Sequence, residues 1–247
     1  MLSISEIYKK FEMLHSYSFS TINDGYPELR VAHFITYDNE GLYFQTMKVK
    51  PFYKQLKDTN KVAVLSMVSE NKAVEHDEKG LSEFPPGFFI RVKGDVKEID
   101  FDTLSEKAAK DERFLPLVKD IERYPTMTTF VLYRFSGEIY DFDYEKVNRD
   151  NKLDRQRFSF NGFEYVESGF QIDKDKCIAC GSCYKVCTFS AIEKGKSYYK
   201  IKQNYCDECG NCYSVCPVNA IKPKVEMSEK ERAHCKKVLN NNLKANK

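Results

Sequence analysis

Several features that would point to a membrane or nucleic-acid protein are missing from this sequence. It has no apolar run long enough to span a bilayer, so we expect no membrane span. The first residues lack a charged region followed by an apolar stretch, so we expect no signal peptide. Its 39 basic and 37 acidic residues leave a net charge of +2, and no arginine-rich stripe is present. Charge therefore gives no reason to expect binding to nucleic acid or to a membrane.

Common catalytic and regulatory patterns are also missing. No Ser/His/Asp set or paired carboxylates stand out, so hydrolysis and acyl transfer have no support. No G-x-G-x-x-G segment follows a predicted strand, which argues against a Rossmann-type NAD domain. No helix-turn-helix or basic helix is apparent, so a DNA-binding iron–sulfur sensor is not favoured.

The sequence does contain nine cysteines, eight of them in two copies of C-x2-C-x2-C-x3-C at residues 177–187 and 206–216. The copies lie 29 positions apart, and the similarity extends beyond the cysteines. Matching pairs are Ile172 and Ile201, Gly181 and Gly210, Tyr184 and Tyr213, Ala191 and Ala220, and Ile192 and Ile221. We therefore predict a duplicated structural unit whose halves pack about a pseudo-twofold axis.

Zinc and disulfides are the simpler alternatives for so many cysteines. Zinc sites usually have paired CxxC or Cys/His spacings, and four cysteines in eleven residues fit that geometry poorly. A disulfide framework is typical of secreted chains, and nothing here indicates secretion. Eight reduced cysteines favour the cytoplasm. We expect the ninth, Cys235, to be a free thiol.

Residues 170–223 resemble bacterial two-cluster ferredoxins along their whole length. In that family three closely spaced cysteines bind one [4Fe–4S] cluster and the fourth binds the other cluster. The resemblance implies electron transfer and a crossed set of ligands. One cluster would be bound by Cys177, Cys180, Cys183 and Cys216, and the other by Cys206, Cys209, Cys212 and Cys187.

The residues before this motif are numerous enough for a domain with its own core. A helix is predicted over residues 3–15, where Ser3 and Glu6 form a capping box. Aromatic and β-branched runs predict strands at residues 17–22, 29–37, 42–47, 61–69, 88–99 and 128–142. Helices are predicted at 51–58 and 103–123, the second interrupted near Pro116. This order favours a small closed or partly closed β-barrel.

The predicted domains follow from these elements. We expect a barrel domain at residues 1–143, a linker at 144–169, the ferredoxin domain at 170–223 and a basic, helical tail at 224–247. The linker contains Arg155 and Arg157 and a possible hairpin near residues 158–162. A polar loop over residues 70–87 is long enough to cover a site or a partner.

Residues 29–56 contain a candidate phosphate site. Arg30, Thr46, Lys48 and Lys50 surround a hairpin that leads into a helix, whose first amides could also bind an anion. Taken alone, the segment is better interpreted as a solvated basic turn that leads into a helix. The order of elements, together with Arg91-Val-Lys-Gly94, resembles the pyridoxamine 5′-phosphate oxidase-like FMN-binding split-barrel family.

This second resemblance covers about residues 3–142. It implies FMN between the subunits of a homodimer, with the phosphate bound by Arg30, Thr46, Lys48 and Lys50. The flavin ring would face Val31, Ala32, His33 and Gln45. Residues 88–90 are Phe-Phe-Ile where the oxidases have a polar residue, and no W…R-x-R segment is present, which weakens pyridoxamine phosphate as substrate.

The two resemblances give the predicted fold class: a mainly β split barrel with peripheral helices, plus a small α+β two-cluster ferredoxin-like domain. The predicted function is an FMN- and iron–sulfur-dependent oxidoreductase. Electrons would pass between an external carrier such as ferredoxin or flavodoxin, two [4Fe–4S] clusters, FMN and a small organic acceptor. The alternative is an electron-carrier or assembly subunit that has the clusters but no flavin catalysis.

Overall fold

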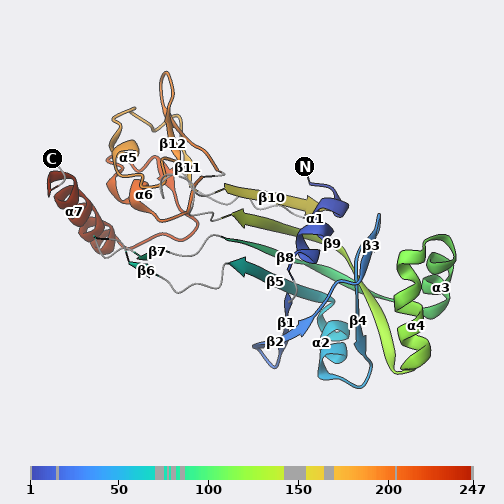
Figure 1. Cartoon of the computed structure of the whole chain (residues 1–247). Helices are drawn as coiled ribbons and strands as arrows, with labels where there is room; N and C mark the ends of the chain where they lie inside the picture. The colour runs from blue at the N-terminus through green and yellow to red at the C-terminus, as the bar shows by residue number, and fades with distance from the viewer. Residues whose placement is uncertain are drawn as a thin grey trace. The chain divides into compact units, whose positions relative to one another are not determined.

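The computed structural model describes residues 2–14, 17–69, 75–76, 78, 82–83, 87–141, 154–163, 170–203 and 205–245 (Figure 1). The chain divides into two compact units. The first comprises Met1–Ser69, Phe88–Ile139 and Gln156–Tyr165, and the second Glu70–Gly87, Tyr140–Arg155 and Val166–Lys247. None of the described helices is both long and apolar enough to cross a membrane.

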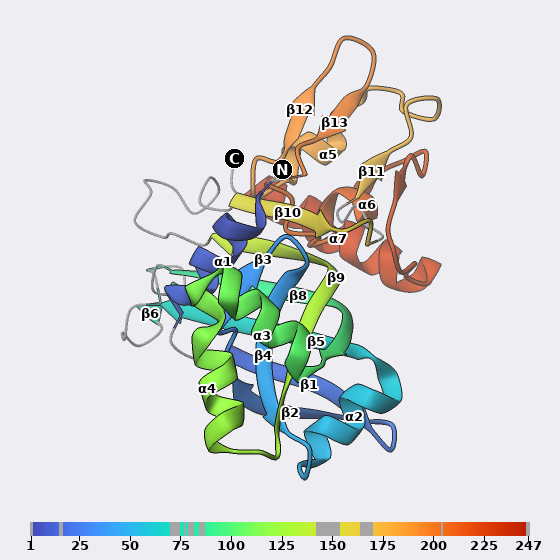
Figure 2. The same ribbon diagram turned by 90° about the vertical axis from the view of Figure 1, so that its right-hand side faces the viewer.

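The first unit is built on an eight-stranded sheet with helices around it (Figure 2). The strands are β1 (Tyr17–Asn23), β2 (Tyr26–Ala32), β3 (Thr36–Asp38), β4 (Gly41–Met47), β5 (Lys61–Ser69), β8 (Gly87–Ile99), β9 (Met127–Asp141) and β10 (Asp154–Phe160). Their order is β2-β1-β5-β8-β9-β4-β3, and β10 also pairs with β9. The helices are α1 (Ile4–Glu12), α2 (Pro51–Thr59), α3 (Phe101–Lys110) and α4 (Leu115–Arg123), with a 3-10 turn, η1 (Glu112–Phe114).

Local sequence signals explain where many of these elements begin and turn. The Ser3 hydroxyl accepts from the amide of Glu6 at 3.2 Å, and the Glu6 carboxylate accepts from the amide of Ser3 at 2.7 Å. This confirms the predicted capping box at the start of α1. Two hairpin turns follow from strand pairing, because β1 pairs with β2 and β3 with β4, both antiparallel. In the first turn, Asp24 and Gly25 both have positive φ.

The core of the sheet is aromatic. Phe19 and Phe44 lie with their ring centroids 5.0 Å apart, and Phe34 and Phe52 pack around them. Strand β4 is buried on both faces, because alternate side chains point to opposite sides of a strand. Its Tyr43 belongs to a second apolar cluster beneath α3 and α4.

Three segments differ from their predicted form. The strand predicted at 29–37 is two strands, β2 and β3, and Phe34 between them is buried in the core. The residues predicted as linker include β10, whose Phe158 is buried against the sheet. The helix predicted at 103–123 is interrupted at Asp111, whose side chain accepts from the amide of Arg113, and Pro116 lies in the first turn of α4.

The loop predicted over residues 70–87 falls mostly outside the described residues. Its described parts are the short paired strands β6 (Glu75–His76) and β7 (Ser82–Glu83). Its predicted role in covering a pocket stays a prediction.

The C-terminal part of the second unit is a small α+β domain. Strand β11 (Gln171–Ile172) pairs with β14 (Ile221–Lys222), and β12 (Ile192–Lys194) pairs with β13 (Tyr199–Ile201), both antiparallel. Short helices α5 (Ser182–Lys185) and α6 (Asn211–Val215) follow the two cysteine loops, and α7 (Glu229–Ala245) packs against α6. Together with the mainly β first unit and its peripheral helices, this domain confirms the predicted fold class.

The predicted pseudo-twofold repeat is visible in matched contacts. Phe170 packs on Tyr213 with ring centroids 6.4 Å apart, and the equivalent pair, Tyr199 and Tyr184, is 6.0 Å apart. The backbone repeats as well. Left-handed torsions occur at Ala179, Gly181 and Ser190 and again 29 residues later at Glu208, Gly210 and Asn219. Gly181 and Gly210 each immediately precede a short helix. Both glycines have φ near +80°, a conformation that glycine adopts at little cost.

Candidate cluster and flavin sites

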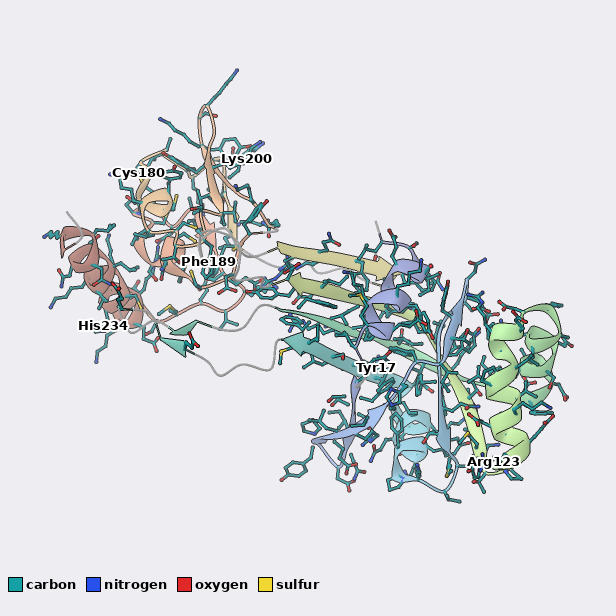
Figure 3. The ribbon with its side chains drawn as sticks, viewed as in Figure 1. Tyr17, Arg123, Cys180, Phe189, Lys200 and His234 are labelled. Carbon is teal, nitrogen blue, oxygen red and sulfur yellow. The ribbon has the colours of Figure 1, made fainter. Side chains whose placement is uncertain are left out.

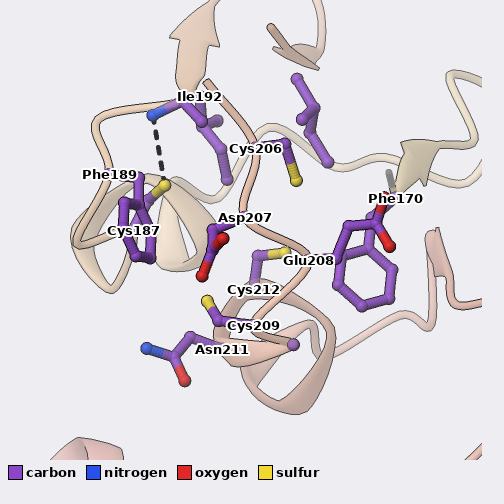
Figure 4. A pocket seen from close by; sticks show the side chains of 13 residues that line it. Phe170, Cys187, Phe189, Ile192, Cys206, Asp207, Glu208, Cys209, Asn211 and Cys212 are labelled. Carbon is purple, nitrogen blue, oxygen red and sulfur yellow. Dashed lines mark hydrogen bonds between the residues drawn. The ribbon is translucent and has the colours of Figure 1, made fainter. Parts of the chain in front are cut away.

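Two pockets in the C-terminal domain gather the eight motif cysteines. One, here called the Cys180 pocket, is lined by Cys177, Cys180, Cys183 and Cys216. The other, the Cys209 pocket, is lined by Cys187, Cys206, Cys209 and Cys212. Each pocket therefore brings together three cysteines of one half and the last cysteine of the other half. In the Cys209 pocket the four sulfurs face a common space (Figure 4).

Apolar side chains enclose both pockets. The Cys209 pocket is bounded by Phe170, Phe189 and Ile192, and the Cys180 pocket by Ile172, Tyr199 and Ile221. Cys180 and Phe189 can be located in Figure 3. Backbone amides also point at the sulfurs: Ala191 donates to the Sγ of Cys187 and Ala220 to the Sγ of Cys216, both at 3.3 Å. Such amide–sulfur bonds stabilise the negative charge of an iron–sulfur cluster.

Without a metal, burial disfavours the charged thiolate form of the buried cysteines. It raises the pKa of Cys183 to about 11 and raises the pKa values of Cys209 and Cys212. Cys180 differs, because its hydrogen bond with Ser182, supported by the charge of Lys185, lowers its pKa. A cationic iron core would offset the cost of burying thiolates, so the donor set suits a metal cluster.

The arrangement is not that of a single-ion site. Among the described residues, no three His, Cys, Asp or Glu side chains converge closely enough to hold one metal ion. Around a tetrahedral zinc all four sulfurs lie about 2.3 Å from the same ion. In a cubane each cysteine binds a different iron, so the four sulfurs stand farther apart, as these pockets allow. The ninth cysteine, Cys235, lies on α7 and lines neither pocket.

In the first unit, Arg30 lies beside the first turn of α2. Its guanidinium is 4.3 Å from the ring centroid of Phe52, which follows Pro51 at the start of that helix. It also donates to the hydroxyl of Thr21 at 2.5 Å and to the carboxylate of Glu28 at 3.1 Å. Burial lowers the pKa of Arg30, and the charge of Glu28 opposes that shift. Arg30 is thus fixed in place and partly neutralised.

The segment between β4 and α2 holds three other predicted residues. Thr46 is buried, and within the described part of the chain its hydroxyl makes no hydrogen bond. Lys50 occupies the N-cap of α2, where no side chain caps the helix, and it forms no ion pair with a described residue. Lys48 is exposed and its Nζ lies 3.8 Å from the carboxylate of Glu98. Pro51 has no amide hydrogen and the amide of Tyr53 donates to the carbonyl of Lys50, so the free donors near an anion here are Thr46, Lys50 and the amide of Phe52.

The residues predicted at the flavin ring are less clearly grouped. Gln45 faces the other side of β4 from Thr46, because its amide donates to the carbonyl of Leu117 at 2.9 Å and to Thr129 at 3.1 Å. Val31 and His33 are exposed on and just after β2, which is an edge strand of the sheet, and Ala32 is half-buried. The side chain of Gln45 is thus not brought together with those of Arg30 and Lys50.

Two carboxylates near this site were not predicted from the sequence. Glu28 accepts from Gln55 at 2.7 Å as well as from Arg30, and Glu98 accepts from Lys57 at 3.0 Å and from Thr128 at 2.7 Å. The alternation of β2 could have placed Glu28 on the same face as Arg30. Nothing local in the sequence links Glu98 on β8 to Lys48.

Comparison with known proteins assigns the residues of the two cysteine pockets to a family. Residues 170–223 match the family model of the 4Fe-4S dicluster domain. No curated protein matches the chain.

Solved structures similar to the chain include a NimC/NimA family protein from Clostridium acetobutylicum, with 16% identity, 64% of this chain and 92% of that chain covered, and a TM-score of 0.44. A FAD and heme binding protein from Mycobacterium smegmatis is 13% identical. The match covers 67% of this chain and 75% of that chain, with a TM-score of 0.42. A FAD-binding protein from Mesorhizobium loti has 19% identity, covers 55% and 94%, and has a TM-score of 0.37.

The family match and the eight-cysteine repeat cover the same residues, and a domain of this type transfers electrons. Residues 170–223 of this chain are a 4Fe-4S dicluster domain of the ferredoxin type.

Proposed function

We propose that this chain is an FMN- and iron–sulfur-dependent oxidoreductase that reduces a small organic acceptor with electrons from an external one-electron carrier. The observation that carries the proposal is the pairing, in one chain, of two four-cysteine pockets with a cationic site at the start of α2. We place the protein in the cytoplasm, where thiols stay reduced. A ferredoxin or flavodoxin would be the carrier, and no nucleic acid is involved.

The ligation we propose is crossed. Cys177, Cys180, Cys183 and Cys216 bind one [4Fe–4S] cluster, and Cys206, Cys209, Cys212 and Cys187 bind the other. The two pockets support this assignment, because each already contains one such set of four.

FMN, when bound, exchanges one or two electrons, which suits it to connect one-electron clusters with a two-electron acceptor. The chain's own residues would hold the cofactor. Arg30 and Lys50 would supply positive charge to the phosphate, Thr46 a hydroxyl, and Phe52 the free amide in the first turn of α2. Arg30 is pre-oriented by Thr21 and Phe52, so little of its side-chain entropy is lost on binding.

The exposed face of β2, β1 and β5 supports a homodimer with FMN near its interface. Leu29, Val31, Leu65 and Met67 on this face are between 48% and 71% exposed. Val31 and Leu65 are both paired with Ser18, so they lie in one row across three strands. Exposed apolar side chains on both sides of Ser18 favour an interaction site on this face, and β2 lies at the edge of the sheet.

Substituting both Val31 and Leu65 with Asp tests this interface. We expect the dimer to dissociate, because two buried, unpaired carboxylates in each subunit oppose association. Light scattering coupled to size exclusion measures the mass, and released flavin is measured on the same sample. Phe101→Asp is the control, since Phe101 is an exposed apolar residue on α3. A double variant that remains dimeric would exclude this face.

One observation favours the alternative, an electron carrier without flavin. Two of the three predicted phosphate-binding cations already have carboxylate partners, Arg30 with Glu28 and Lys48 with Glu98. An anion entering the site would have to compete with those ion pairs.

The deciding experiment measures iron, sulfide and released flavin per chain in anaerobically purified protein. About eight irons and one FMN per chain would support the oxidoreductase. About eight irons without flavin, even after FMN is added back, would leave the electron carrier and remove every flavin residue named above.

A further inference from the structure

The duplicated halves of the dicluster domain differ in charge at equivalent positions. Between the first two cysteines of each motif, the first half has Ile178 and Ala179 and the second has Asp207 and Glu208. Ile178 lines the Cys180 pocket, while Asp207 and Glu208 line the Cys209 pocket (Figure 4). No charged side chain is among the residues that line the Cys180 pocket.

Two positively charged side chains lie near the cysteines of the Cys180 pocket. Lys185 occupies the position of Ser214 in the repeat, and its charge acts on Cys180. Arg232 of α7 reaches back to the domain: it donates to the carbonyl of Cys216 at 2.9 Å and to that of Tyr213 at 2.8 Å. Within the described part of the chain, neither Lys185 nor Arg232 forms an ion pair with a carboxylate.

The cations near the Cys209 pocket are neutralised. Arg155 donates to the carbonyl of Cys206 at 3.1 Å, as Arg232 does to Cys216, but it also lies 3.7 Å from Asp207 and 3.5 Å from Glu208. Lys224 lies 3.9 Å from Glu208. Arg155 and Lys224 thus lie near the carboxylates of this loop, whereas Lys185 and Arg232 have no carboxylate partner among the described residues.

Hydrogen bonds to sulfur add to the same difference. The hydrogen bonds from backbone amides to the sulfurs of Cys187 and Cys216 are equal in length, at 3.3 Å each, so they do not distinguish the two clusters. The Sγ of Cys180, however, lies 3.5 Å from the hydroxyl of Ser182, which becomes the donor once the thiol is a thiolate. The equivalent residue, Asn211, donates instead to the carbonyl of Val186.

We propose that the cluster in the Cys180 pocket has the higher reduction potential of the two, so that the first electron to enter the domain comes to rest there. Reduction adds one negative charge to a cluster, and nearby positive charge and donors to sulfur stabilise that charge. The acidic loop that lines the Cys209 pocket makes its cluster the stronger reductant. This inference rests on the crossed ligation proposed above.

The test is a potentiometric titration of the full chain with dithionite, followed by electron paramagnetic resonance. In the wild-type protein the two clusters should take up one electron each, in two resolved steps. Lys185→Ser, which copies the second half, should lower the upper step and leave the lower one unchanged. Asp207→Asn with Glu208→Gln should raise the lower step alone, because these changes keep the side-chain shapes and remove two negative charges.

Controls separate this inference from the proposed function. Lys196→Ser removes the same charge from an exposed position that lines neither pocket and should move neither step. Iron is measured in every variant. A protein with fewer than about eight irons would contradict the two-cluster proposal itself. With full iron content, three outcomes would overturn this inference but not the two-cluster proposal. The two steps could be unresolved, Lys185→Ser could move the lower step, or the Asp207/Glu208 change could move the upper step.

Discussion

The dicluster domain and the proposed flavin site of the first unit are encoded in different ways. The cysteines come from two stretches of eleven residues, and each pocket takes one of its four cysteines from the other half. The proposed phosphate site instead combines Arg30 on β2, Thr46 at the end of β4 and Lys50 at the start of α2. A site fixed by close spacing can be identified in a sequence, whereas a site assembled from several elements depends on how they pack.

The two sites also differ in the partners their residues already have. The cysteines face one another in apolar pockets, where buried thiols have raised pKa values. Two of the three cations of the proposed flavin site, Arg30 and Lys48, lie near Glu28 and Glu98. A single substitution should therefore have a larger effect in the dicluster domain than at the phosphate site.

The largest expected effect is that of Cys187→Ser, which tests whether each cluster takes its fourth cysteine from the other half. We expect iron to fall from about eight to about four per chain, with loss of the cluster that Cys206, Cys209 and Cys212 bind. Iron analysis and paramagnetic resonance measure this. Cys235→Ser, which changes a cysteine outside both pockets, should keep all the iron. If Cys187→Ser loses the cluster of the Cys180 pocket instead, the crossed assignment is wrong.

The next effect tests whether the two regions depend on each other. Phe158 is buried in the first unit, and Phe158→Ala should lower the free energy of unfolding of that unit by about 3–5 kcal/mol. Chemical denaturation followed by circular dichroism measures the loss. Iron content should not change, because no residue of either pocket is altered. Loss of iron together with stability would show that the two regions are coupled, and Phe101→Ala, at an exposed position, should alter neither.

The smallest effect concerns the flavin phosphate. Lys50→Ala should weaken FMN binding about tenfold, since a hydrogen bond to a charged group contributes about 1.5–3 kcal/mol. Flavin retention after gel filtration and fluorescence titration measure this, with iron content unchanged. Lys54→Ala on the same helix is the matched control, because Lys54 is already paired with Asp58. Unchanged FMN binding would remove Lys50 from the site.

Most secondary structure of the first unit could be predicted because its signals are local. The capping box at Ser3, the turn at Asp24-Gly25 and the proline at the start of α2 each act within a few residues. The role of β10 could not be predicted, because its charged sequence surrounds only one fully buried side chain, Phe158. The partners Glu28 and Glu98 were missed for a related reason: strand pairing and packing, not local pattern, bring them to the cations.

The sequence by itself determined the two sets of cysteines, their repeat and the residues of the dicluster domain, because cluster ligands must follow one another at short, fixed spacings. Tertiary structure alone decided which charges stand near each pocket. Arg232 reaches Cys216 from a helix that begins after the domain, and Arg155 reaches Cys206 from well before it. Electrostatic interactions act through space, so the surroundings that set a cluster's potential are known only once the chain has folded.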